Sequence, residues 1–283
     1  MQDMSLRSAV EQALDTSGPW LWQALGEGVG GVRWRLTGPD TASFVKTGDA
    51  DVLAAEADGL VALAPHMRVP RVLAQGPGWL ALEWLEFART GAASGARLGE
   101  ALAAMHLLPQ ARFGWVRPNF IGATPQFNTP GDDWIGFFRE QRLGFQLRLA
   151  AENGYRGSLQ EHGAELSACL PRFFAGYSPR PALLHGDLWG GNWGACLDGG
   201  PVLFDPAVYC GDRETDLAMT ELFGGFPSEF HAAYRANAPL DAGYGVRRDL
   251  YNLYHVLNHL NLFGAGYLAQ AERGIRRLLA EAS

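Results

Sequence analysis

The sequence has little of what marks several classes of protein. Its 283 residues include three cysteines (Cys169, Cys196 and Cys210), too few for a disulfide scaffold and without the spacing of a zinc site. There is no long basic run, and the net charge is −7, which argues against a protein that binds nucleic acid or membrane surfaces. No stretch of 18 apolar residues occurs, so we expect no membrane-spanning helix. These absences predict a protein of a reducing cytoplasm.

What the sequence does have is enough apolar material for two lobes around a cleft. Hydrophobic residues make up 47 % of the chain, so a large core can form and disorder is not expected. The first segment, MQDMSLRSAVEQALD, has the pattern of a short charged amphipathic helix and not that of a signal peptide.

The apolar pattern predicts an α+β protein whose first third is rich in strands. Residues 34–38 and 43–48 alternate around a turn and predict a hairpin, which follows the glycine-rich connection LGEGVGGV. A helix is expected over 51–64, with two further strands after it. From about residue 96 the pattern becomes helical, with helices expected at 96–108, 132–154 and 159–174 and again after residue 213. Small residues loosen the chain near 84–95, so we predict lobes of 1–88 and 89–283.

Two short β segments interrupt the helices, and each ends in a carboxylate. HGDLWGGN places Asp187 and Asn192 five residues apart, and Asp205 follows Asp187 by 18 residues. Two carboxylates and an amide are oxygen ligands that suit Mg²⁺ together with phosphate oxygens. In phosphoryl transfer, one aspartate accepts the proton of the attacking hydroxyl, while an asparagine and a second aspartate hold the metal. Alone, the same residues would be ordinary turn formers beside glycine, but the ensemble favours phosphoryl transfer.

The motifs HGDLWGGN, FDPAVYCGDRETDLAM, ELFGGF and LYNLYHVLNHLNLFG resemble the fructosamine kinase (ketosamine 3-kinase) family. This family lies among the protein-kinase-like small-molecule kinases. The HGDxxxxN motif and the second aspartate are shared with aminoglycoside and choline kinases. The resemblance covers almost the whole chain. It implies a bilobal fold, with a small β-rich N-terminal lobe and a larger, mainly helical C-terminal lobe, and it implies the cofactors ATP and Mg²⁺. Asp187 is then the catalytic base, and Asn192 and Asp205 are the metal ligands.

A kinase of this kind needs a lysine on a small-lobe strand for the α- and β-phosphates, and a helix glutamate to hold the lysine. Lys46, in SFVKTG, is the sole lysine of the chain. Arginine fills every other basic position. Arginine can replace lysine where only surface charge is needed, but its forked guanidinium differs from a compact ammonium, so the one lysine indicates a specific role. We therefore assign Lys46 to the nucleotide, with Glu56 of the following helix as its partner. Asp58 competes for that role.

The glycine-rich segment is expected to cover the nucleotide phosphates with backbone N–H groups, through Gly28, Gly30 and Gly31. The family that the chain resembles usually carries a polar residue and an asparagine after its paired glycines, whereas this chain has Val32 and Arg33. The register of the phosphate contacts therefore stays open. The backbone of Glu83, Trp84 and Leu85 is expected to meet the adenine ring.

The remaining candidates surround the catalytic loop. We assign His185 and Asp216 to its support, although Asp216 is equally explained as a helix cap. Trp189 is expected to cover the apolar face of a sugar beside the base, or else to pack the loop. Asp212 and Glu214 could touch the substrate.

The sequence thus predicts an ATP- and Mg²⁺-dependent kinase acting on a sugar hydroxyl of a ketosamine, free or protein-linked, as a monomer or weak homodimer. The resemblance implies phosphorylation at O3 and a role in deglycation. One alternative is a kinase of aminoglycosides or amino alcohols. Others are a catalytically silent nucleotide-binding protein and a metal-dependent hydrolase.

Overall fold

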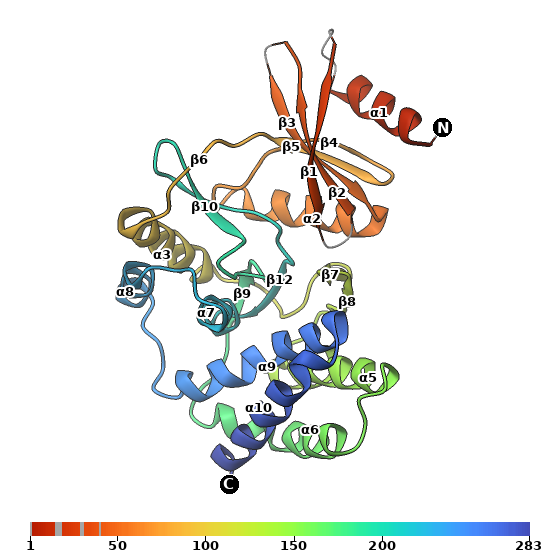
Figure 1. Ribbon diagram of the computed structural model, residues 1–283. Helices are drawn as coiled ribbons and strands as arrows, with labels where there is room; N and C mark the ends of the chain where they lie inside the picture. The colour runs from red at the N-terminus through yellow and green to blue at the C-terminus, as the bar shows by residue number, and fades with distance from the viewer. Residues whose placement is uncertain (1, 15–18, 29–30, 40) are drawn as a thin grey trace.

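The computed structural model describes residues 2–14, 19–28, 31–39 and 41–283. Its first part is built on an antiparallel five-stranded sheet in the order β1-β2-β3-β5-β4 (Figure 1). The strands are β1 (Leu21–Gly28), β2 (Gly31–Thr37), β3 (Ala42–Gly48), β4 (Val72–Gly76) and β5 (Trp79–Glu83).

The two faces of this sheet are covered by different helices. Neighbouring side chains of a strand point to opposite faces, so they pack against different helices. Val45 of β3 packs in a cluster with Val10 of α1 (Gln2–Ala13). Leu80 of β5 belongs instead to the cluster that contains Leu60 of α2 (Ala50–Leu63). Lys46 follows Val45 and therefore points to the face that α2 covers.

The second part is mainly helical and lies below the sheet in Figure 1. Its helices are α3 (Ala92–His106), α4 (Trp134–Phe138), α5 (Gly144–Glu152), α6 (Ser158–Cys169), α7 (Glu214–Leu222), α8 (Ser228–Asn237), α9 (Tyr244–Phe263) and α10 (Leu268–Glu281). A π-helical segment (Arg139–Leu143) and two 3-10 segments (Leu170–Phe174 and Ala265–Tyr267) adjoin them. Within the described residues, no helix combines the length and apolar character needed to cross a membrane.

Small antiparallel sheets hold the loops of the second part. They are β6 (Phe87–Ala88) with β10 (Trp193–Cys196) and β11 (Pro201–Leu203), β9 (Pro181–Leu184) with β12 (Tyr209–Asp212), and β7 (Asn119–Ile121) with β8 (Thr124–Gln126). β9 and β11 are the two short β segments that precede the two aspartates.

The predicted α+β architecture, with a β-rich first part and a larger helical second part, is confirmed. Two local predictions were wrong. The supposed glycine-rich connection at 25–32 belongs largely to β1 and β2, which pair with Gly28 opposite Gly31. The single helix expected over 132–154 is divided by the π-helical segment, where the N–H of Gly144 donates to the carbonyl of Arg139. The lobe boundary at residue 88 stays a prediction.

Candidate active site

The loop that carries Asp187 follows β9 and is fixed by its backbone. The N–H groups of His185 and Gly186 donate to the carboxylate of Asp216, at 2.7 and 2.8 Å. Gly186 has φ +83°, and a Cβ at this position would lie 2.0 Å from the carbonyl oxygen of Ala207. Only glycine combines this backbone with so close an approach. Asp216 of α7 thus supports the loop, as expected.

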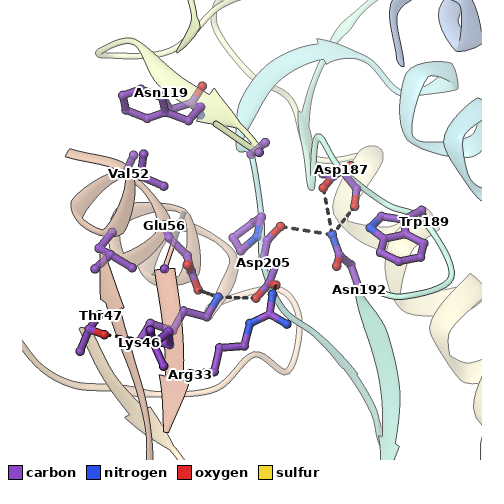
Figure 2. Close-up of a pocket in the computed structure, with 18 residues that line it drawn as sticks. Arg33, Lys46, Thr47, Val52, Glu56, Asn119, Asp187, Trp189, Asn192 and Asp205 are labelled. Carbon is purple, nitrogen blue, oxygen red and sulfur yellow. Dashed lines mark hydrogen bonds and ion pairs between the residues drawn. The ribbon is translucent and has the colours of Figure 1, made fainter. Parts of the chain in front are cut away.

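The side chain of Asp187 is half-buried and keeps some contact with solvent. The amide nitrogen of Asn192 donates to the Asp187 carbonyl at 2.8 Å and to its Oδ2 at 3.1 Å (Figure 2). Burial, followed by the negative charge of Asp205, raises the pKa of Asp187 to about 7 despite that hydrogen bond. A carboxylate with this pKa can take up a proton near neutral pH.

His185 joins the two aspartate loops through its ring. Its Nδ1 accepts from the N–H of Asp187 at 3.3 Å, so that its Nε2 donates to the carbonyl of Phe204 at 3.0 Å. Burial lowers the pKa of His185, which keeps the ring neutral. The histidine therefore acts as a structural link, in agreement with the supporting role predicted for it.

Lys46 connects the sheet to the second aspartate. Its Nζ donates to Glu56 at 2.7 Å and to Asp205 at 2.6 Å (Figure 2). Burial opposes the charge on Lys46, but the two carboxylates raise its pKa above the usual range. Burial likewise opposes ionisation of Asp205, yet Lys46 and then Arg33 hold the pKa of Asp205 below its usual range. The competing candidate Asp58 pairs instead with Arg117.

Three pockets meet around these residues. The hinge pocket, of about 500 Å³, is bounded by Glu83, Trp84 and Leu85 on one side. No backbone hydrogen bond joins Leu85 to the rest of the described chain, so its N–H and C=O can meet a ligand. A pocket with apolar walls and free backbone groups suits a planar heterocycle.

The central pocket lies between the sheet and the catalytic loop, and Lys46, Glu56, Asp187 and Asp205 line it. Of the predicted glycines, Gly31 lines this pocket, whereas Gly28 lines none of the three pockets. Gly30 lies outside the described residues. Asn192 and Asp205 line both the central and the hinge pocket, so both residues lie where the two pockets join.

The aromatic pocket, of about 290 Å³, opens on the other side of Asp187. The rings around it are Trp189, Phe223, His255, His259, Phe263 and Tyr267. Trp189 is 40 % exposed and lines all three pockets. The sequence singled out Trp189 but not Phe223, Phe263 or Tyr267, because the spacing of aromatic residues in helices mainly indicates core packing.

Asp212 and Glu214 are not brought to this cleft. Asp212 is fully buried and accepts hydrogen bonds from the hydroxyls of Tyr177 and Tyr251, at 2.9 and 2.6 Å. Glu214 is fully buried against Arg247, at 2.7 Å. Each carboxylate is thus occupied inside the second part of the chain, and neither lines the hinge, central or aromatic pocket.

Arg33 is a cleft residue that the sequence did not single out as functional. It lines the hinge and central pockets, and its Nη2 lies 3.7 Å from Oδ2 of Asp205. A cue was present in the sequence, because Arg33 occupies a position where the resembled family usually has asparagine.

A strand-borne lysine held by a helix glutamate, with two loop aspartates and an asparagine across a cleft between lobes, defines a protein-kinase-like phosphotransferase. A family model described as fructosamine kinase matches residues 22–281. The chain belongs to the fructosamine kinase family and is an ATP-dependent phosphotransferase.

Individual relatives agree with this assignment. A probable ketoamine kinase of Synechocystis sp. is 46 % identical over 246 residues, which are 83 % of this chain and 82 % of the relative. A chloroplastic protein-ribulosamine 3-kinase of Arabidopsis thaliana is 40 % identical over 81 % of this chain and 73 % of its own. The crystal structure of a provisionally assigned fructosamine-3-kinase from Thermobifida fusca superposes with a TM-score of 0.86 at 33 % identity, covering 96 % of this chain and 99 % of that one.

Proposed function

We propose that the protein transfers the γ-phosphoryl group of ATP to a hydroxyl of a ketosamine, with Asp187 as the base. The observation that carries this proposal is the position of Asp187, which lines both the central pocket and the aromatic pocket. A nucleotide that enters from the hinge side and an acceptor that enters from the aromatic side would meet at this carboxylate.

The nucleotide is held by groups from both parts of the chain. The adenine ring occupies the hinge pocket against the backbone of Glu83 to Leu85, and Lys46 binds the α- and β-phosphates. Because Glu56 and Asp205 already hold the ammonium of Lys46, its position is fixed before the nucleotide arrives. Preorganised charge of this kind lowers the reorganisation needed during phosphoryl transfer.

Asn192 and Asp205 fit the magnesium ion that this chemistry uses. Within the described residues, no group of three or more His, Cys, Asp or Glu side chains could hold a metal ion. A cation here therefore relies on an amide, a carboxylate, water and phosphate oxygens, which is the donor set that Mg²⁺ prefers. When bound, the ion neutralises charge on the transferring phosphate. The amide N–H of Asn192 faces Asp187, so the amide oxygen of Asn192 is the atom left for a metal.

Asp187 handles the proton. The acceptor oxygen forms a bond to the γ-phosphorus while the bond from that phosphorus to the β,γ-bridging oxygen breaks. The hydroxyl proton passes to the carboxylate of Asp187, and ADP leaves. The hydrogen bond from Asn192 orients the carboxylate, and Asp216 holds the loop backbone that carries it.

The acceptor occupies the aromatic pocket. Trp189 borders both this pocket and Asp187, so its ring can cover the apolar face of a sugar next to the base. Rings can also accept a cationic amine through their π faces, which fits a sugar attached to an amine. The names of the Synechocystis and Arabidopsis relatives support a ketosamine, and the latter name supports O3 as the site of phosphorylation.

We place the protein in the cytoplasm as a monomer or weak homodimer.

A substrate panel tests this function. Magnesium-dependent ADP release is measured with ribulosamines, fructosamines and erythrulosamines, and with choline and an aminoglycoside. We expect at least one ketosamine to be turned over far faster than choline or the aminoglycoside. Faster turnover of choline or the aminoglycoside than of every ketosamine would contradict the acceptor, while leaving the kinase activity intact.

The variant Trp189→Ala tests the position of the acceptor. Its KM for the ketosamine should rise more than its KM for ATP, because the sugar loses its stacking face. Leu197→Ala is a matched control, since Leu197 is an apolar residue that is 73 % exposed on the turn after β10 and lines none of the three pockets. An unchanged acceptor KM in Trp189→Ala would remove the tryptophan from the acceptor site.

A further inference from the structure

Arg33 lies where the hinge pocket and the central pocket join. Four residues line both pockets: Arg33, Trp189, Asn192 and Asp205. Arg33 is the one cation among these four. If the base of a nucleotide is in the hinge pocket and its last phosphate is near Asp187, the phosphate chain must pass this junction.

The guanidinium of Arg33 is held loosely, whereas the ammonium of Lys46 is not. The two residues lie opposite each other in the pairing of β2 with β3. Lys46 is nearly buried and makes close contacts with Glu56 and Asp205, at 2.7 and 2.6 Å. The Arg33 side chain is 41 % exposed and approaches Asp205 only to 3.7 Å. Within the described part of the chain, no hydrogen bond uses this guanidinium, so its donors are available.

The central pocket has more negative than positive side chains, so a bound triphosphate needs a cation besides Lys46. Three carboxylates line the pocket (Glu56, Asp187 and Asp205) against two cations, Lys46 and Arg33. The charge of Lys46 is already shared between two of these carboxylates. A nucleotide triphosphate adds further negative charge, and a guanidinium can donate two parallel N–H groups to phosphate oxygens.

We propose that Arg33 is a second phosphate-binding residue that acts from β2, opposite Lys46, and exchanges Asp205 for phosphate when the nucleotide binds. The exchange frees Oδ2 of Asp205 for a metal ion. This inference rests on the proposed use of ATP. It also accounts for the departure of the glycine-rich segment from the resembled family, because a long charged side chain on the strand supplies a contact that asparagine would not reach in the same way.

Calorimetry with Mg–ATP and with adenosine, in the absence of any acceptor, tests the proposal. Arg33→Ala should bind Mg–ATP about tenfold more weakly than the parent, because a charge-assisted hydrogen bond is lost. Its affinity for adenosine should be unchanged. Arg33→Lys should fall between Arg33→Ala and the parent, because it keeps the charge but not the fork.

Arg35→Ala is the matched control. Arg35 lies two residues further along β2, lines neither pocket, and covers the ring of Trp84 at 4.4 Å. Its removal should leave the ratio of Mg–ATP affinity to adenosine affinity unchanged. If Arg33→Ala keeps the parental ratio, whether both affinities stay the same or fall together, the inference is overturned. A parent protein that binds no Mg–ATP would instead contradict the proposed function itself.

Discussion

At the scale of single residues, the site depends on what surrounds each charge. Asp187 and Asp205 are both half-buried aspartates, yet the pKa of Asp187 is raised to about 7 and that of Asp205 is lowered. The difference comes from their partners, since Asp205 has Lys46 and Arg33 while Asp187 has a neutral amide. Two carboxylates with opposed pKa values can divide the work, one as a base and the other as a permanent anion.

The first prediction concerns the pH dependence of catalysis. Asp187 must be ionised to accept the hydroxyl proton, so kcat/KM for the acceptor should fall as the pH drops through the pKa of this group. That pKa is about 7 before a metal ion binds. A bound cation lowers it, so the acid limb should lie at or below this pH. Asp187→Asn should lower kcat by roughly 10²–10⁴ and remove this limb. A variant that keeps the limb would assign it to another group.

The second prediction uses the fact that Lys46 is the sole lysine. An amine-directed ATP analogue should label Lys46 and the N-terminal amine, and excess Mg–ATP should protect Lys46. Because the pKa of Lys46 is raised, labelling should speed up as the pH rises. Lys46→Arg controls for the N-terminal reaction. Labelling of Lys46 that Mg–ATP does not slow would place the lysine outside the nucleotide site.

At the scale of elements, the geometry of the catalytic loop depends on contacts with other elements of the chain. β9 delivers the loop, α7 supplies Asp216 to brace it, and Gly186 lets it pass directly beside Ala207 of the second aspartate loop. The N–H of Ala207 also donates to the carbonyl of His185, at 2.8 Å. The two aspartate loops are therefore positioned as one unit.

The third prediction is that Gly186→Ala is destabilising and nearly inactive. The new Cβ would meet backbone at 2.0 Å in a residue with φ +83°. We expect the free energy of unfolding to fall by roughly 2–4 kcal/mol, as for strained backbone with overpacking. Gly154→Ala is the matched control, because Gly154 has φ +93° and no atom near its Cβ position; it should lose only about 1 kcal/mol. Equal losses in urea unfolding would show that the contact with Ala207 is unimportant.

The sequence predicts these elements to different degrees. Local patterns define β2, β3 and α2, and with them the contact between Lys46 and Glu56, because strand and helix periods determine which side chains face each other. The end of β1 and the start of β2 were mistaken for a connection, since their glycines hide the alternation typical of strands. The sequence did not show that Asp212 and Glu214 are buried away from the cleft. Their contacts with Tyr251 and Arg247 are tertiary contacts to α9, which a local pattern does not reveal. The aromatic pocket was missed because its rings come from segments far apart in the sequence: the catalytic loop, the residue after α7, α9 and the segment after α9.

At the scale of the whole molecule, the strand-rich part and the helical part both contribute residues to the central pocket. β6 pairs with β10 beside the hinge, Arg117 binds the carbonyl of Ala54 in α2 at 3.2 Å, and Lys46 reaches Asp205. The site is therefore assembled from segments that are far apart in the sequence. A ligand that contacts both parts should stabilise the whole fold.

The fourth prediction follows from this assembly. Mg–ATP should raise the free energy of unfolding by about 2.7 kcal/mol at a concentration of 100 Kd, as expected for a ligand that binds only the folded state. Asp205→Ala should lose most of the part of this gain that depends on Mg²⁺, because the cation loses its carboxylate. A gain that is the same in the variant and the parent would mean that the metal ion is held elsewhere.

The most direct test of the account follows the phosphate itself. ATP carrying a labelled γ-phosphate is incubated with Mg²⁺ and a ribulosamine, and both the product and the ADP are quantified for the parent and for Asp187→Asn. We predict one labelled phosphate on the sugar for each ADP released by the parent. For Asp187→Asn we predict a rate lower by roughly 100-fold or more with unchanged affinity for ATP. Label that appears only as free phosphate, or transfer at the parental rate by Asp187→Asn, would contradict the central claim.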